Sequence, residues 1–203
     1  MDFDYSLHTF HSPKFQSVVE DAVKFFAETP PHFLPPTMQF IGSGVYGLYY
    51  LGDYDLYDKI AVSNREVQIQ PIYVGKAVPP GWRTARSKEV VMPDLSRRLR
   101  EHARSISQTA NLQIEDFWCR FMILGGVESD LIGAVEAALI RKYRPLWNTI
   151  VDGFGNHDPG AGRYNQARSE WDVLHPGRIW TERLTGTSPN LENIIAKIKQ
   201  FLE

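Results

Sequence analysis

The chain has 203 residues, of which 43% are hydrophobic, so it can bury a core of its own as one domain. It contains no apolar run near the roughly 18 residues of a membrane span, and its acidic opening "MDFDYSLHTF" lacks the pattern of a signal peptide. A formal net charge of −2 argues against indiscriminate nucleic-acid binding. The single Cys119 excludes an internal disulfide, so we expect a cytoplasmic protein.

The first half of the chain predicts one helix and two strands. "SPKFQSVVEDAVKFFAE" opens with Ser12 and Pro13, a helix start signal, and has apolar residues at helical spacing until the prolines of "TPPHFLPP" end the helix. "GVYGLYYL" (44–51) and "VQIQPIYV" (67–74) are rich in aromatic and β-branched residues and are predicted strands. The connection between them, 52–66, is long for a hairpin.

The second half predicts three more helices and a third strand. "MPDLSRRLREHARSI" is a predicted helix capped by Asp94, and "FWCRFMIL" (117–124) is the third strand. "ESDLIGAVEAALIRKYRP" is a predicted helix capped near Ser129 or Asp130, and "SPNLENIIAKIKQFLE" closes the chain as an amphipathic helix. The segment between these two helices is loop-like but too aromatic to be disordered. The pattern indicates an α/β or α+β fold with a small antiparallel sheet and helices around it.

The stretch "QPIYVGKA" (70–77) places Tyr73, Gly75 and Lys76 where the chain leaves a predicted strand. Taken alone, this is the pattern of an ordinary strand end at which Gly75 starts a turn. Further on, seven basic residues between Arg83 and Arg104 stand against three acidic ones, a local charge of +4. Such a cluster is either a solvated helix face or a surface that faces phosphates.

Three polar residues occupy unusual places on the predicted helices. Arg98 and His102 lie four residues apart, hence on one helix face, at the edge of the apolar stripe. Glu136 falls inside an apolar stripe, four residues from both Ile132 and Ile140. A carboxylate in that position needs a compensating cation, metal or hydrogen bond. A buried salt bridge to an arginine and a functional site both satisfy this condition.

The order of these residues resembles that of the GIY-YIG nuclease family. The matching motifs are "GVY" (44–46), "YVG" (73–75) followed by a lysine, "LSRRLREH" (95–102), the glutamate, and an asparagine twelve positions beyond it. "IYVGKA" is close to the form seen in the incision domain of bacterial excision repair. The resemblance covers residues 42–150 and implies an α+β fold with a three-stranded antiparallel sheet flanked by helices. It also implies a catalytic site made of Tyr46, Tyr73, Lys76, Arg98, His102, Glu136 and Asn148.

Two departures affect the alignment. Tyr46 and Tyr73 are 27 positions apart, whereas the family tyrosines are usually separated by little more than a tight hairpin, and a second long segment, "PPGWRTARSKEVVMP", precedes the arginine helix. In addition, "GLY" (47–49) competes with "GVY" for the first motif. We prefer Tyr46 because the family strand usually continues beyond its tyrosine with apolar residues, and Tyr49 would lie on the opposite face of the strand.

The resemblance implies roles in binding for four of the site residues. Glu136 would hold Mg²⁺, or Mn²⁺ in its place, because hard cations prefer carboxylate oxygen. Arg98 would hold the scissile phosphate, whose oxygens match its planar fork. Tyr73 and Asn148 would position these groups.

The resemblance implies that the other three residues handle the proton of the attacking water. Tyr46 would accept this proton, although a free tyrosine has a pKa of about 10, so a positive charge such as that of Lys76 must favour the phenolate. His102 is the competing base because its ordinary pKa is nearer neutral. In the more favoured interpretation, His102 orients Tyr46 or the water.

Beyond the core motifs, "GFGNHDPGAGRYNQARSEWDVLHPGRIW" resembles a small branch of type II restriction endonucleases that read CCGCGG (SacII-type specificity). This implies Mg²⁺-dependent cleavage at a palindromic site in double-stranded DNA by a homodimer that forms at least on DNA. We divide the single domain, 1–203, into an N-terminal helical arm (1–41), the nuclease core (42–150) and a DNA-recognition extension (151–203). The N-terminal helix or the insert at 52–66 is the expected dimer contact.

A target made only of G·C pairs favours arginine, whose fork pairs with guanine in the major groove. The candidate readers are Arg83, Arg86, Arg163, Arg168 and Arg178, although most protein–DNA hydrogen bonds go to phosphates. We interpret "GNHDPG" as a structured turn, because His157 and Asp158 have no third ligand at the spacing of a metal site. Two rival functions stay open: a structure-specific or repair nuclease with the same site, and a catalytically silent DNA-binding module.

Overall fold

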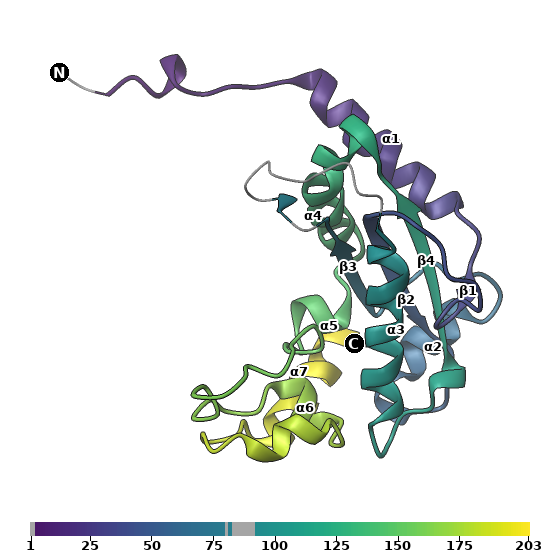
Figure 1. Ribbon diagram of the computed structural model, residues 1–203, viewed down its shortest axis with the longest axis vertical. Helices are drawn as coiled ribbons and strands as arrows, with labels where there is room; N and C mark the ends of the chain where they lie inside the picture. The colour runs from purple at the N-terminus through teal and green to yellow at the C-terminus, as the bar shows by residue number, and fades with distance from the viewer. Residues whose placement is uncertain (1–2, 80, 83–91) are drawn as a thin grey trace.

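A sheet of four antiparallel strands lies at the centre of the computed structural model, which describes residues 3–79, 81–82 and 92–203 (Figure 1). The strands follow the order β1-β4-β2-β3, and their bounds are β1 His32–Phe33, β2 Gly44–Tyr50, β3 Tyr73–Ala77 and β4 Phe117–Ile123. The predicted α+β class is confirmed. The prediction of three strands was one short, because β1 is added at the edge beside β4.

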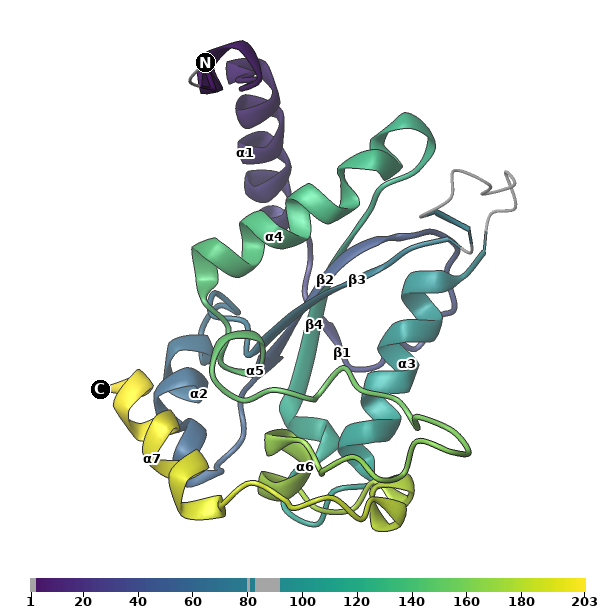
Figure 2. The ribbon, with the colours of Figure 1, turned by 90° about the vertical axis from the view of Figure 1, so that its left-hand side faces the viewer.

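Helices cover both faces of the sheet (Figure 2). The four longest are α1 Pro13–Glu28, α3 Asp94–Ser107, α4 Ile132–Tyr143 and α7 Leu191–Leu202. On one face, Tyr46 and Leu48 of β2 share a core with Leu99 of α3. On the other face, Val45 shares a core with Val135 of α4 and with residues of α1. Because successive strand residues point to opposite faces, this double cover buries every residue of β2.

The additional strand β1 is two residues long and pairs His32 with Cys119 of β4. It lies inside "TPPHFLPP", where the flanking prolines cannot donate to a ladder and so limit the strand. A strand of this length has no periodic pattern, and the sequence therefore gives no signal for it.

The strand β3 begins at Tyr73 rather than at residue 67, because the side chain of Asn64 binds the preceding backbone. The Asn64 carbonyl oxygen accepts hydrogen bonds from the amides of Ile69 and Gln70 at 3.1 and 2.9 Å. Its amide group donates to the carbonyls of Gln70 and Tyr50 at 2.9 and 3.1 Å. These backbone groups are satisfied by a side chain instead of a neighbouring strand.

The predicted helix starts are confirmed in part. Ser12 caps α1, and its Oγ accepts a hydrogen bond from the amide of Phe15 at 3.2 Å. Asp94 is not the cap of α3, because the N-cap position is occupied by Pro93. Asp94 instead lies buried in the first turn, where it accepts a hydrogen bond from Ser43 Oγ at 2.9 Å and so attaches the helix to the residue before β2.

Three short helices lie where loops were predicted, namely α2 Asp58–Asn64, α5 Leu146–Thr149 and α6 Glu170–Leu174. They have four to seven residues, which is too few to show helical periodicity in the sequence. The helix α4 starts at Ile132, beyond the predicted cap at Ser129 or Asp130, because a 3₁₀ turn over Gly126–Leu131 precedes it.

The C-terminal extension packs into the core on the α3 face of the sheet. The ring of Trp147 lies 4.5 Å from that of Phe154 and 5.6 Å from that of Trp171, measured between centroids. His175 is fully buried, with its Nε2 2.6 Å from the hydroxyl of Tyr57, which precedes α2. Burial lowers the pKa of His175 to about 3, so this histidine is neutral near pH 7. The 52–66 insert and the C-terminal extension therefore contribute to the same hydrophobic core.

The N-terminal segment before α1 extends away from the body of the protein (Figure 1). It carries large apolar side chains that are 64–87% exposed, namely Phe3, Tyr5, Leu7 and Phe10. Within the described ranges, no helix has both the length and the apolar character needed to cross a membrane.

Candidate active site

Tyr46 of β2 and His102 of α3 form a buried pair. The hydroxyl of Tyr46 lies 2.6 Å from Nε2 of His102, and the two residues are 0% and 2% exposed. Burial raises the pKa of Tyr46 well above its ordinary value. Burial, followed by the charge of Arg98, lowers the pKa of His102 well below its own. Both groups are therefore neutral near pH 7, and a proton can move along the hydrogen bond that joins them.

Gly75 of β3 provides the space that Tyr46 occupies. It is opposite Tyr46 in the β2–β3 ladder, and a side chain there would collide with the Tyr46 hydroxyl and the Tyr73 ring. Tyr73 itself lies beside the buried pair, with its ring centroid 5.3 Å from that of His102, and burial raises its pKa. Gly75 is an interior residue of β3, which continues to Ala77, so it does not start a turn.

Arg98 lies one helical turn before His102 and contacts the C-terminal extension. It donates a hydrogen bond to the carboxylate of Glu101 at 3.1 Å and another to the carbonyl of Gly155 at 3.2 Å. It also contacts Nε2 of His157. Gly155 and His157 follow Arg98 by 57 and 59 positions in the chain. No local sequence pattern predicts contacts over such a separation.

An ion pair joins β3 to α4 on the other face of the sheet. The Nζ atom of Lys76 lies 2.5 Å from Oε2 of Glu136, and the side chains are 33% and 18% exposed. The cation that compensates Glu136 is thus a lysine. Burial is the main cause of the raised pKa values of Tyr46 and Tyr73, and the charge of Glu136 adds a smaller contribution to both. The charge of Arg98 acts in the opposite direction and lowers the pKa of both tyrosines, which is the effect that the sequence suggested for Lys76.

Asn148 of α5 binds the free edge of β3. Its carbonyl oxygen accepts a hydrogen bond from the amide of Val74 at 2.7 Å, and its amide group donates to the carbonyl of the same residue at 2.8 Å. The side chain thereby satisfies both backbone groups of Val74 on this edge strand. Asn148 therefore fixes the position of the strand that carries Tyr73 and Lys76.

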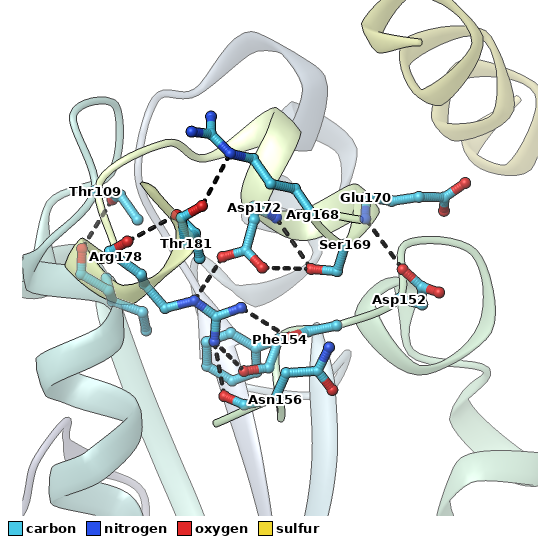
Figure 3. Close-up of polar contacts among 12 residues, drawn as sticks. Thr109, Asp152, Phe154, Asn156, Arg168, Ser169, Glu170, Asp172, Arg178 and Thr181 are labelled. Carbon is cyan, nitrogen blue, oxygen red and sulfur yellow. Dashed lines mark hydrogen bonds and ion pairs between the residues drawn. The ribbon is translucent and has the colours of Figure 1, made fainter. Parts of the chain in front are cut away.

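Arg178 is buried and holds together a loop of the extension (Figure 3). It is 1% exposed, and its Nε donates to the carboxylate of Asp172 at 2.6 Å. Its terminal nitrogens donate to the carbonyls of Gly153, Phe154 and Asn156 at 2.9 to 3.0 Å. In this structure the guanidinium of Arg178, a predicted reader of DNA, is therefore occupied by contacts within the chain and is not exposed.

The other predicted readers differ in exposure. Arg163 is exposed on the loop that follows Gly160. Arg168 is half-buried, and its Nε donates to the carbonyl of Thr181 at 3.2 Å. Arg83 and Arg86 lie outside the described residues.

The residues around β3 suit a divalent cation that takes few protein ligands. In the described part of the chain, no group of three His, Cys, Asp or Glu side chains is placed to hold a metal ion. Mg²⁺ is usually bound through one or two carboxylates, with water and phosphate oxygens as its other ligands. Glu136 fits this chemistry, since its carboxylate already binds one cation, the ammonium of Lys76. Asp158 instead accepts a hydrogen bond from the amide of Gly160, as expected of a structured turn.

Comparison with known proteins relates this geometry to a family. Residues 38–202 match the family model described as the Eco29kI GIY-YIG domain. The matched range contains every predicted site residue and nearly all of the C-terminal extension. A comparison with curated proteins finds no match to the chain.

Proposed function

The chain belongs to the GIY-YIG restriction endonuclease family represented by the Eco29kI domain, and we propose that it is a type II enzyme of that family. In this proposal the protein acts in the cytoplasm and hydrolyses phosphodiester bonds at a palindromic site in double-stranded DNA, CCGCGG, with Mg²⁺ or Mn²⁺. The proposal is carried by the cluster of complementary groups around β3. These groups are Tyr46, Tyr73, Arg98 and His102, together with the Lys76–Glu136 pair.

Two charged groups in this cluster suit the binding of a phosphodiester. The planar guanidinium of Arg98 matches the geometry of phosphate oxygens and forms charge-assisted hydrogen bonds to them. Glu136 would hold the divalent ion, which when bound stabilises negative charge on the phosphate and on the leaving oxygen. Lys76 orients the carboxylate of Glu136 through their ion pair.

The Tyr46–His102 pair suits the removal of a proton from water. A free phenolate at Tyr46 is disfavoured, because burial raises the pKa of this tyrosine. The neutral imidazole of His102 can accept the phenol proton while the Tyr46 oxygen accepts a proton from the attacking water. Such a relay uses both candidate bases in sequence and needs no long-lived phenolate. The anionic phosphate at Arg98 would offset the charge that His102 gains.

The experiment that tests the proposal is digestion of several sequenced DNAs with Mg²⁺, followed by sequencing of the fragment ends. We expect discrete ends at CCGCGG on both strands. Preferential cutting of branched or flapped DNA would support the structure-specific or repair alternative. Binding without any cleavage would support the silent DNA-binding module. Discrete ends at another palindrome would contradict only the assigned site.

We expect Arg163 to read a base, because it is exposed in the extension, whereas Arg178 is buried. Replacing Arg163 by alanine should cost about 1–3 kcal/mol of specific binding and relax one position of the site. Arg163→Lys is the matched variant, since it keeps the charge but loses the fork that pairs with guanine. Selection of cleaved sites from a randomised library measures the preference. If both variants weaken all sequences alike, Arg163 contacts only phosphate.

We also expect a homodimer on DNA, because a palindrome presents two equivalent strands and one site cuts one phosphodiester. The exposed arm at residues 3–12 is the better candidate contact. The insert at 52–66 already buries Tyr57, Ile60 and Ala61 within its own chain. Light scattering of the DNA complex should give two chains of 23.2 kDa per duplex, and deletion of residues 1–12 should lower that stoichiometry. A single chain per duplex in the intact protein would contradict the dimer.

A further inference from the structure

A short loop of the C-terminal extension forms one wall of the candidate site. We name residues 153–157 the clamp loop. Its Gly155 carbonyl and its His157 imidazole both contact the guanidinium of Arg98. Its Phe154 ring stacks on His102, with centroids 4.6 Å apart and planes at 18°, and meets the Tyr73 ring edge-on at 4.8 Å. The loop therefore contacts three of the residues gathered around β3.

The clamp loop is fixed in place by interactions that do not involve Arg98. The buried guanidinium of Arg178 binds the carbonyls of Gly153, Phe154 and Asn156, and its Nε also donates to the carboxylate of Asp172 (Figure 3). The clamp loop is thus held at three of its carbonyls by an arginine that forms a buried ion pair with Asp172. Because the loop is anchored independently, its contacts define where the guanidinium of Arg98 lies.

His157 contacts Arg98 as a hydrogen-bond acceptor. Arg98 has only donors, so the Nε2 atom that faces it must carry a lone pair, and the proton of the neutral imidazole lies on Nδ1. The charged groups that act on His157 are Arg98, which contacts it, and Glu101 and Arg178. Burial and the charge of Arg98 lower the pKa of His157, and Arg178 adds to this, while Glu101 acts in the opposite direction. The net effect favours the neutral, accepting form.

We propose that His157 is a positioning residue of the nuclease reaction, which orients the guanidinium of Arg98 toward the scissile phosphate. Two acceptors on the clamp loop, the Gly155 carbonyl and the His157 imidazole, restrict rotation of the guanidinium before DNA arrives. Glu101 and His157 both accept a hydrogen bond from Nη1 of Arg98. Because Glu101 is charged and His157 is neutral, a phosphate oxygen replaces His157 at this atom more readily than it replaces Glu101. The proposal rests on the proposed nuclease function.

The test compares single-turnover cleavage and DNA affinity for three variants of the full chain. His157→Ala should lower the cleavage rate at saturating DNA about tenfold while changing the DNA dissociation constant less than about threefold, because orientation and not charge is lost. His157→Gln should restore most of the rate, since its amide oxygen can accept the same hydrogen bond. His32→Gln, at the opposite edge of the sheet, is the matched control and should behave as the wild type.

A pH profile separates positioning from a merely structural role. Protonation of His157 removes its lone pair, so wild-type cleavage should fall as the pH drops through a value below 6.5. In His157→Gln this acid limb should move to lower pH, while the rate at neutral pH is kept. If the wild type cleaves DNA and His157→Ala has the same cleavage rate and pH profile, the positioning role of His157 is overturned and the proposed function is not. A wild-type protein that cuts no DNA would overturn the proposed function and the inference with it.

Discussion

Replacement of Glu136 by glutamine should abolish DNA cleavage while leaving the fold and DNA binding nearly intact. Glutamine keeps the shape of the side chain and can still accept a hydrogen bond from Lys76, so only the negative charge is lost. A catalytic metal ion contributes several kcal/mol to transition-state stabilisation, and each 1.36 kcal/mol is a factor of ten in rate. We therefore expect the cleavage rate to fall by more than about a hundredfold at saturating Mg²⁺.

The matched control for this prediction is Glu170→Gln. Glu170 pairs with Lys197 at 2.5 Å and its side chain is 20% exposed, so it resembles Glu136 in its ion pair and burial. It lies in α6 of the extension, and its loss should leave cleavage near the wild-type rate. Affinity is measured by DNA titration in Ca²⁺ or EDTA, and the rate by quenched-flow or gel assay in Mg²⁺. A Glu136→Gln variant that cuts at the wild-type rate would show that the metal assignment is wrong.

The sequence was sufficient for those parts of the site that follow from local periodicity. Arg98 and His102 lie on one helix face because they are four residues apart, and alternation along β2 places Tyr46 toward that helix. Glu136 stood out because a carboxylate in an apolar stripe needs a partner, and the structure supplies Lys76. In each case the position of a side chain is set within one element of regular structure.

The sequence was insufficient where function depends on contacts between distant segments. The contact of His157 with Arg98 and the anchoring of the clamp loop by Arg178 involve a region without helical or strand periodicity. An arginine beside glycines has the same local pattern whether it reads a base or binds loop carbonyls. Burial separates these two uses, and burial is a property of the folded chain. The same limit applies to Asn64, whose four hydrogen bonds delay the start of β3.

The alignment of the first motif is testable because the two candidate tyrosines lie on opposite faces of β2. Tyr46 faces His102, whereas Tyr49 lies on the side of Val45, with the guanidinium of Arg120 6.0 Å from its ring centroid. Both tyrosines are almost fully buried. Loss of either hydroxyl is therefore a matched change in volume and burial, and the two substitutions differ in their distance from the candidate site.

Tyr46→Phe should lower the cleavage rate about 10²- to 10⁴-fold, the range that general acid–base catalysis contributes, whereas Tyr49→Phe should stay near the wild type. The change at Tyr46 also leaves Nε2 of His102 without its partner, at a cost of about 1–3 kcal/mol in the free energy of unfolding. Urea denaturation measures this cost and shows that the variant remains folded under assay conditions. Full activity in Tyr46→Phe combined with loss in Tyr49→Phe would place the first motif at residues 47–49. Full activity in both variants would remove tyrosine from the proton relay and leave His102 as the base.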